Sequence, residues 1–77
     1  MTVSILNILI MAKIQLNGSK LELKNKYSIA TLLKKYKIDV KKVAVELNGK
    51  IINRNKYKSI NVKNKDKVEI VHFIGGG

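Results

Sequence analysis

Two Asn-Gly pairs, Asn17-Gly18 and Asn48-Gly49, do most to limit how this 77-residue chain can fold. Each pair stands between short runs in which apolar and polar residues alternate, as they do in half-buried β-strands. Both central residues of a two-residue hairpin turn take a positive φ, which asparagine and glycine tolerate best. The sequence therefore predicts two tight β-hairpins, over residues 13–23 and 43–52.

One amphipathic helix is predicted between the hairpins. Ile29, Leu32, Leu33 and Tyr36 follow the i, i+3, i+4, i+7 spacing of a helical face that packs against a core. Ser28 precedes this run and is suited to cap the first turn through its hydroxyl oxygen.

The segment KVEIVHFI, residues 67–74, is the most convincing strand of the sequence. In a strand, Val68 and Ile70 would share one face, and Glu69, Val71 and Phe73 the other. The segment SINV, residues 59–62, could add a further short strand.

The predicted order is β-β-α-β-β-β, which indicates an α+β fold with one helix packed on a mixed sheet of four to five strands. The β-grasp is the simplest topology with this order, and it places the first and last strands side by side and parallel at the sheet centre. We expect one domain over residues 11–74. Residues 1–10 form an apolar extension, either dispensable or an added strand, and residues 75–77 form a flexible glycine tail.

Composition argues against a catalytic centre in this chain. There is no cysteine and only one histidine, His72. Disulfides, thiolate metal sites and thiol nucleophiles are thus excluded, and a histidine cluster or a Ser-His-Asp arrangement is disfavoured. We expect a carrier without bound cofactor or metal in the reduced cytoplasm, and no membrane partner, because residues 1–10 are too short to span a bilayer.

The formal net charge of +11 raises the question of nucleic-acid binding. Arg54 is the single arginine among sixteen basic residues, although guanidinium groups are the usual readers of bases and phosphates. Lysine, asparagine and isoleucine all have AT-rich codons, so a biased genome explains the charge. We therefore expect no nucleic-acid partner and keep a basic binding module as an alternative.

The last three residues, Gly75, Gly76 and Gly77, are the feature most suggestive of function. Glycine has no Cβ, so this segment could enter a narrow slit and leave the terminal carboxylate open to attack. A carboxylate reacts only after activation, and the chain has no phosphate-binding loop for ATP. Another protein must therefore activate the tail.

Docking to that protein requires a surface on the folded body. Val71, Phe73 and Ile74, with Ala44 beside them, could form an exposed apolar patch next to the tail. Ordinary packing on the second face of the sheet, under residues 1–10, explains the same residues equally well.

From about residue 11 onward the sequence resembles the ThiS family, the sulfur carriers of thiamin biosynthesis. The segments that carry the resemblance are IQLNG, VAVELNGKII, NKDKVEIV and the terminal IGGG. The resemblance implies a β-grasp fold and a reactive Gly76-Gly77 end, with Gly75 as an additional glycine. Where many members have Gly-Asp before the last strand, this chain has Lys65-Asp66. Asp66 and Arg54 are interpreted as turn or surface-pair residues.

The resemblance also implies partners and chemistry. An E1-like enzyme would use ATP and Mg²⁺ to adenylate the Gly77 carboxylate, and a sulfur donor such as a cysteine desulfurase would convert it to a thiocarboxylate. The chain would then deliver sulfur to thiazole synthase. Two alternatives share the tail, namely a small subunit of molybdopterin synthase and a ubiquitin-like protein modifier.

Overall fold

The structure is a computed structural model that describes residues 11–73 of the chain. Its elements, in chain order, are β1 (Ala12–Leu16), β2 (Ser19–Leu23), α2 (Ile29–Lys35), the 3-10 turn η1 (Val40–Lys42), β3 (Val43–Leu47), β4 (Lys50–Ile51), the 3-10 turn η2 (Arg54–Lys56) and β5 (Lys67–His72). The predicted limits of the domain, the extension and the tail lie at or beyond the ends of the described residues, so they stay predictions.

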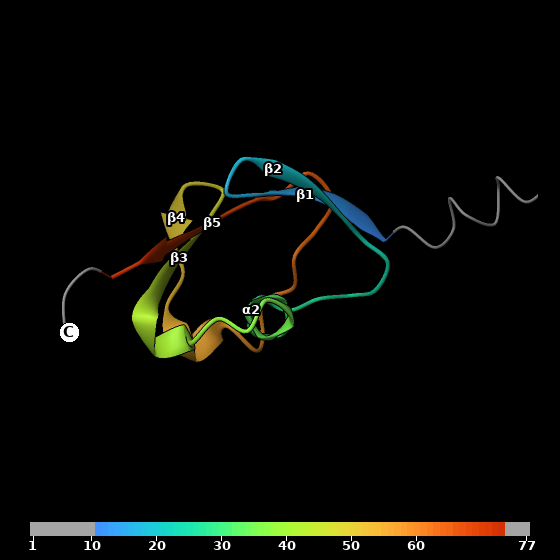
Figure 1. The fold of residues 1–77 in the computed structure, drawn as a ribbon. Coiled ribbons are helices and arrows are strands. Elements are labelled where there is room, and N and C mark those ends of the chain that lie inside the picture. Colours follow the sequence, from blue (N-terminus) through green and yellow to red (C-terminus); the bar gives the residue numbers. More distant parts are fainter. Residues whose placement is uncertain (1–10, 74–77) are drawn as a thin grey trace, which may run out of the picture.

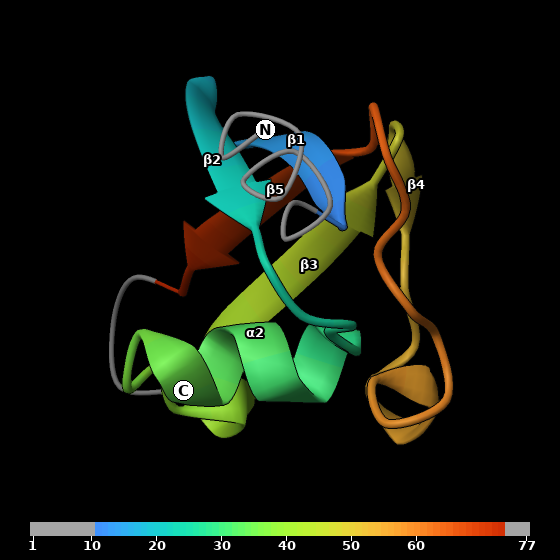
Figure 2. The same cartoon turned by 90° about the vertical axis from the view of Figure 1, so that its right-hand side faces the viewer.

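The five strands form one mixed sheet in the order β2-β1-β5-β3-β4. β1 and β5 are parallel neighbours, and the other three pairs are antiparallel. α2 lies across one face of the sheet, which we call the inner face, and the opposite outer face is turned away from it (Figures 1 and 2). The α+β fold with β-grasp topology is therefore confirmed.

Both predicted hairpin turns are present. Asn17 and Gly18 have φ of 49° and 83°, and Asn48 and Gly49 have φ of 53° and 85°. These are the positive values that a two-residue turn between twisted strands needs. The first hairpin pairs five residues of β1 with five of β2, whereas the second has only a two-residue return strand.

The core lies between α2 and the inner face of the sheet. The alternation of each strand and the stripe of the helix supply most of it, as predicted, but Tyr57 and Val62 enter it from the long irregular connection after β4. The buried residues are Ala12, Ile14, Leu23, Ile29, Leu32, Leu33, Val43, Val45, Tyr57, Val62, Val68 and Ile70.

The predicted strand at residues 59–62 is wrong. This segment makes one isolated bridge, Ser28↔Asn61, and none of its residues belongs to the sheet. The Ile29 N–H donates to Ile60 O and the Val62 N–H to Tyr27 O, both at 2.9 Å. Residues 59–62 therefore bond to the residues at and just before the start of α2. The first N–H groups of a helix have no partner within the helix and must find one elsewhere.

The start of α2 is as predicted, but its end is not. The Thr31 N–H donates to the Ser28 hydroxyl oxygen at 3.0 Å, which caps the first turn. The helix ends at Lys35, so Tyr36 is its C-cap and remains 41% exposed instead of completing the buried stripe.

A Schellman motif ends the helix early. Lys37 has a φ of 56°, its N–H donates to Lys34 O at 3.0 Å, and the Ile38 N–H donates to Leu33 O at 3.0 Å. Glycine usually occupies this left-handed position, since a side chain there crowds the backbone.

Lys37→Gly should therefore raise the free energy of unfolding by about 1 kcal/mol, because it removes left-handed strain from a non-glycine residue. Lys34→Gly, in the last helical turn and with the same loss of charge, should lower it by up to about 1 kcal/mol. Urea denaturation followed by circular dichroism measures both. Equal losses in the two variants would contradict this account of the helix end.

Candidate functional site

The strand that leads to the C-terminus, β5, is the central strand of the sheet. On one side it pairs with β3 over five residues, from Val43↔His72 to Leu47↔Val68. On the other side it pairs with β1 at two positions only, Gln15↔Lys67 and Leu16↔Val68. The main chain of β1 therefore supports only the first part of β5.

Asn17 extends this support along β5. Its main-chain N–H donates to Val68 O at 2.9 Å, as a further rung of the ladder. Its carboxamide then takes the place of a strand: Oδ1 accepts from the Ile70 N–H at 2.7 Å, and Nδ2 donates to Ile70 O at 3.3 Å. One turn side chain thus holds both main-chain groups of Ile70.

Asn48, in the second hairpin turn, holds the other end of the strand. Its main-chain N–H donates to Lys67 O and its Oδ1 accepts from the Lys67 N–H, both at 2.8 Å. Its Nδ2 donates to Asp66 Oδ1 at 2.9 Å, and Asp66 Oδ2 accepts from the Lys63 N–H at 2.7 Å. Asp66 is therefore a turn residue, as predicted, while Arg54 lies exposed in η2.

The structure brings together part of the predicted docking patch. Ala44 lies directly across from Val71 on the outer face, where Val71 is 51% exposed and Ala44 is half-buried. Phe73 is 55% exposed, and its N–H donates to Lys42 O at 2.9 Å, which continues the register of the strand. Ile74 and the tail residues Gly75, Gly76 and Gly77 lie outside the described residues, as do residues 1–10, which were the alternative cover for this patch.

Sequence reasoning placed Glu69 on this face with Val71 and Phe73, but it missed two further residues, Ile51 and Glu46. Ile51, which at 75% is the most exposed large apolar side chain among residues 11–73, lies across from Glu46, and Glu46 lies across from Glu69. Glu46 and Ile51 are each the second residue away from the Asn48-Gly49 turn, and this equal spacing would have placed them on one face of the hairpin. We call the outer-face set of Ala44, Glu46, Ile51, Glu69, Val71 and Phe73 the docking face.

The pairing of Glu46 with Glu69 is unusual for a chain with five acidic residues and a charge of +11. Each of the other three acids has a partner: Glu22 faces the Lys13 ammonium at 3.9 Å, Asp39 accepts from the Lys41 N–H, and Asp66 holds its turn. Within residues 11–73, no ion pair or hydrogen bond of the two facing carboxylates is found. Like charges directly opposite each other in a sheet are destabilising.

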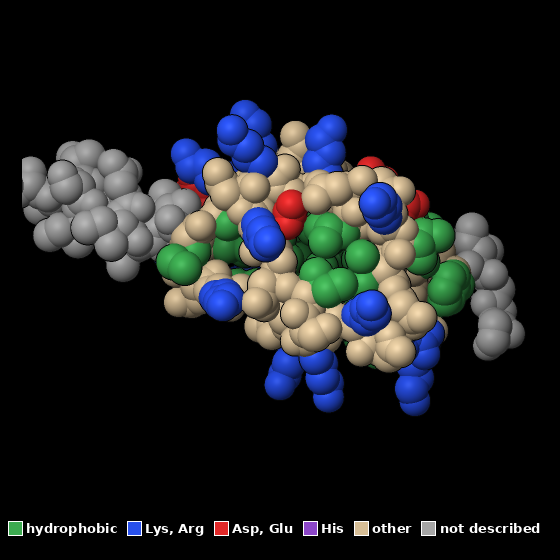
Figure 3. All heavy atoms as spheres, turned by 180° about the vertical axis from the view of Figure 1, so that it is seen from behind, with side chains coloured by type: hydrophobic (Ala, Val, Ile, Leu, Met, Phe, Trp, Pro, Cys, Tyr) green, Lys and Arg blue, Asp and Glu red, His purple; other side chains and the backbone are tan. Residues whose placement is uncertain are grey.

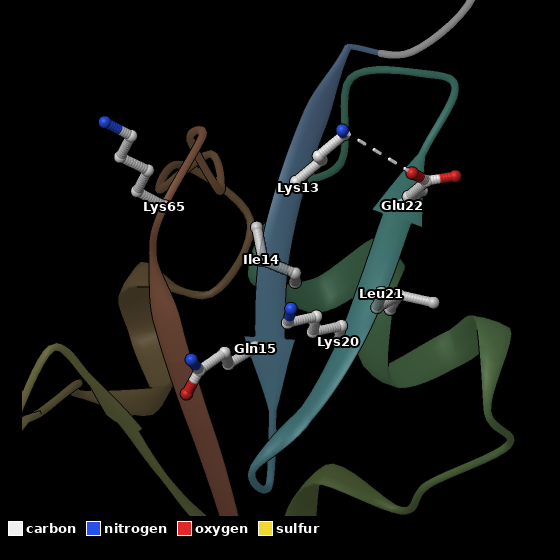
Figure 4. A pocket seen from close by; sticks show the side chains of 7 residues that line it. All are labelled: Lys13, Ile14, Gln15, Lys20, Leu21, Glu22 and Lys65. Atoms are coloured by element: carbon white, nitrogen blue, oxygen red, sulfur yellow. Dashed lines mark ion pairs between the residues drawn. The ribbon is translucent and has the colours of Figure 1, made fainter.

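A shallow hollow on the first hairpin carries no catalytic arrangement. Figure 4 shows that Lys13 reaches across from β1 toward Glu22 on β2, while the amine of Lys65 points away from both strands. The Lys13–Glu22 pair is well exposed on both sides and is therefore worth little.

On the face that Figure 3 shows, the basic side chains do not gather into one stripe. In Figure 3 the lysine and arginine side chains are spread over the whole visible face, between patches of hydrophobic atoms, and acidic groups are few. A groove that follows a nucleic-acid backbone would gather them into a stripe.

A metal cluster and a membrane-spanning helix each set requirements for the described part of the chain. Among residues 11–73, no three side chains of the ligating types His, Cys, Asp and Glu come together. α2 has seven residues, and no helix among those described has the length and apolar character to cross a bilayer.

Comparison with known proteins gives one consistent result. The model of the ThiS family matches residues 8–77. The "Sulfur carrier protein ThiS" of Bacillus subtilis is 40% identical over 65 residues, which cover 83% of this chain and 98% of that protein. A "Thiazole synthase" of Paramagnetospirillum magneticum is 38% identical over 65 residues, covering 84% of this chain but 20% of that protein. The crystal structure of ThiS from Geobacter metallireducens matches with a TM-score of 0.74 and 31% identity, covering 84% of this chain and 99% of that chain.

The facing glutamates give a prediction about stability. Glu69→Lys should raise the free energy of unfolding by up to about 1 kcal/mol, because it turns a cross-strand repulsion into an attraction. Glu22→Lys makes the same change of net charge but places a second ammonium beside Lys13, so it should lower stability. Urea unfolding at low ionic strength measures both effects, and salt should shrink them. Destabilisation by Glu69→Lys would contradict the repulsion.

Proposed function

This chain belongs to the ThiS family, and we propose that it is a sulfur carrier for the assembly of the thiazole ring of thiamin. The observation that carries the proposal is the match along almost the whole of a known sulfur carrier, together with a sequence that ends in Gly75-Gly76-Gly77. This match favours the thiamin pathway over molybdopterin synthesis and over protein modification. We place its work in the cytoplasm.

The proposed chemistry takes place at the carboxylate of Gly77. A carboxylate oxygen attacks the α-phosphorus of ATP on an E1-like enzyme, and pyrophosphate leaves. The terminal sulfur of a persulfide, supplied by a donor such as a cysteine desulfurase, then attacks the acyl carbon and AMP leaves. A second thiol cleaves the S–S bond, which releases the thiocarboxylate. The partner enzymes bind ATP and Mg²⁺ and carry the thiols, whereas this chain contributes the carboxyl group.

The docking face gives the partners a surface to bind. Ordering three glycines in an enzyme's channel costs about 1–2 kcal/mol per residue, so contacts elsewhere must compensate. Ala44, Val71 and Phe73 offer apolar area beside the end of β5, in line with the predicted patch, and Ile51 extends it. Glu46 and Glu69 lie in the same face, so its electrostatic complement is an apolar surface that carries an arginine or a lysine.

Thiazole synthase is proposed as the acceptor of the sulfur. A thiazole synthase of Paramagnetospirillum magneticum contains a region similar to this chain. Sulfur transfer requires the carrier to bind its acceptor. The presence of a region similar to this chain within a thiazole synthase supports the association of the two.

Loading of the tail is tested by intact mass. After incubation with ATP, Mg²⁺, an E1-like enzyme of the family and a persulfide donor, the native chain should gain the mass difference between sulfur and oxygen. A chain that lacks Gly77 should remain unchanged. An unmodified native chain, with partners shown to load a known carrier, would contradict the proposal.

The docking face is tested by Val71→Ser. Loss of a half-exposed apolar contact in an interface costs about 1–2 kcal/mol, so we expect KM for loading to rise roughly 5- to 30-fold while kcat changes little. Tyr36→Ser, which truncates an exposed aromatic residue at the end of α2, is the control and should leave KM unchanged. Equal kinetics for both variants would exclude Val71 from the interface.

A further inference from the structure

The support of β5 changes character at Ile70. Up to Val68, the main chain of β1 and then of Asn17 occupies one flank of the strand, and β3 occupies the other. At Ile70 the β1 flank is filled by the carboxamide of Asn17 alone. Among the described residues beyond Ile70, the bonds found run to the β3 side, the last from the Phe73 N–H to Lys42 O. Within residues 11–73, Asn17 therefore makes the last hydrogen bond on the β1 flank of the strand.

This contact decides how much of the chain before Gly77 is held from both sides. With the carboxamide in place, the hydrogen bonds on the β1 flank reach as far as Ile70. Without it, they reach only Val68, so two more residues of β5 are supported by the β3 flank alone. Gly77 is the seventh residue after Ile70, and a chain of that length reaches at most about 25 Å. A weaker hold on β5 widens the range of directions in which this strand leaves the sheet.

We propose that Asn17 is a positioning residue for the C-terminal carboxylate: its carboxamide, by holding both main-chain groups of Ile70, fixes the direction in which β5 delivers the tail to the activating enzyme. This role rests on the proposed function. A spread of tail positions lowers the fraction of bound complexes whose carboxylate meets the ATP phosphorus, and misplacement of a reacting group by an ångström is costly in rate. The role is distinct from docking, which the outer face provides.

The second hairpin turn supplies a matched control. Asn17 and Asn48 occupy the same position of the same kind of turn, and their φ values are 49° and 53°. Each carboxamide binds β5, but Asn48 binds it at Lys67, where the strand begins. Glycine accepts a positive φ, so Asn17→Gly and Asn48→Gly remove the carboxamides without disturbing either turn. Both variants lose comparable structural hydrogen bonds at opposite ends of one strand.

The experiment compares both variants with the native chain in two measurements. The first is amide hydrogen exchange followed by NMR, which needs no partner. Asn17→Gly should lower protection of the Ile70 amide about tenfold, as expected for loss of one or two net hydrogen bonds, while Asn48→Gly should not lower it beyond its effect on global stability. The second is the kinetics of loading by intact mass. Asn17→Gly should lower kcat about five- to tenfold with KM nearly unchanged, and Asn48→Gly should leave both close to native.

Each other outcome overturns the inference. Equal losses of kcat in the two variants would reduce Asn17 to a stabilising residue, and native kcat in Asn17→Gly would show that the tail needs no such anchor. Unchanged exchange at Ile70 would show that the carboxamide does not hold the strand. If the native chain itself were not loaded by active partners, the proposed function would fail and this role with it, and that case is recognised because all three chains would be equally inert.

Discussion

The structure depends on holding one strand, β5, from every side except its outer face. The inner face of β5 is buried under α2 through Val68 and Ile70, and its two edges are occupied by β1 and β3. Two turn asparagines complete the edges at its start and near its end. Because the chain leaves the described body from this strand, its rigidity is what gives a tail of glycines a defined origin. A small domain cannot obtain this rigidity from a large core, because a single core of this size gives only marginal stability.

Strand alternation allows β5 to serve two purposes at once. Residues of one parity form the core, and those of the other parity, Glu69, Val71 and Phe73, are presented outward. The predicted repulsion between Glu46 and Glu69 would work against stability in the isolated chain, whereas the remaining acids all contribute contacts. A destabilising arrangement that lies beside the exposed apolar residues is best understood as complementary to something outside the chain, and this agrees with a face that binds enzymes.

Local patterns in the sequence predicted most of the fold, and long-range contacts account for what they missed. The Asn-Gly pairs, the helical spacing and the alternation each describe a few neighbouring residues, and together they gave the strands, the helix and the β-grasp. The end of α2 was missed because a lysine at residue 37 gives no sign of a left-handed C-cap. The carboxamide of Asn17 bonds a residue 53 positions away, which no local pattern contains. Ile51 was missed because its face depends on the register across the hairpin.

The lysines themselves bear on the meaning of the +11 charge. Two of them, Lys37 and Lys65, occupy left-handed positions with φ of 56° and 73°, where glycine would be less strained. Selection for a polyanion-binding surface would concentrate lysines on one face, and it would not place them at strained turns. The positions of Lys37 and Lys65 agree with the compositional bias expected from the sequence. The few acidic residues are therefore the more informative charges in this chain.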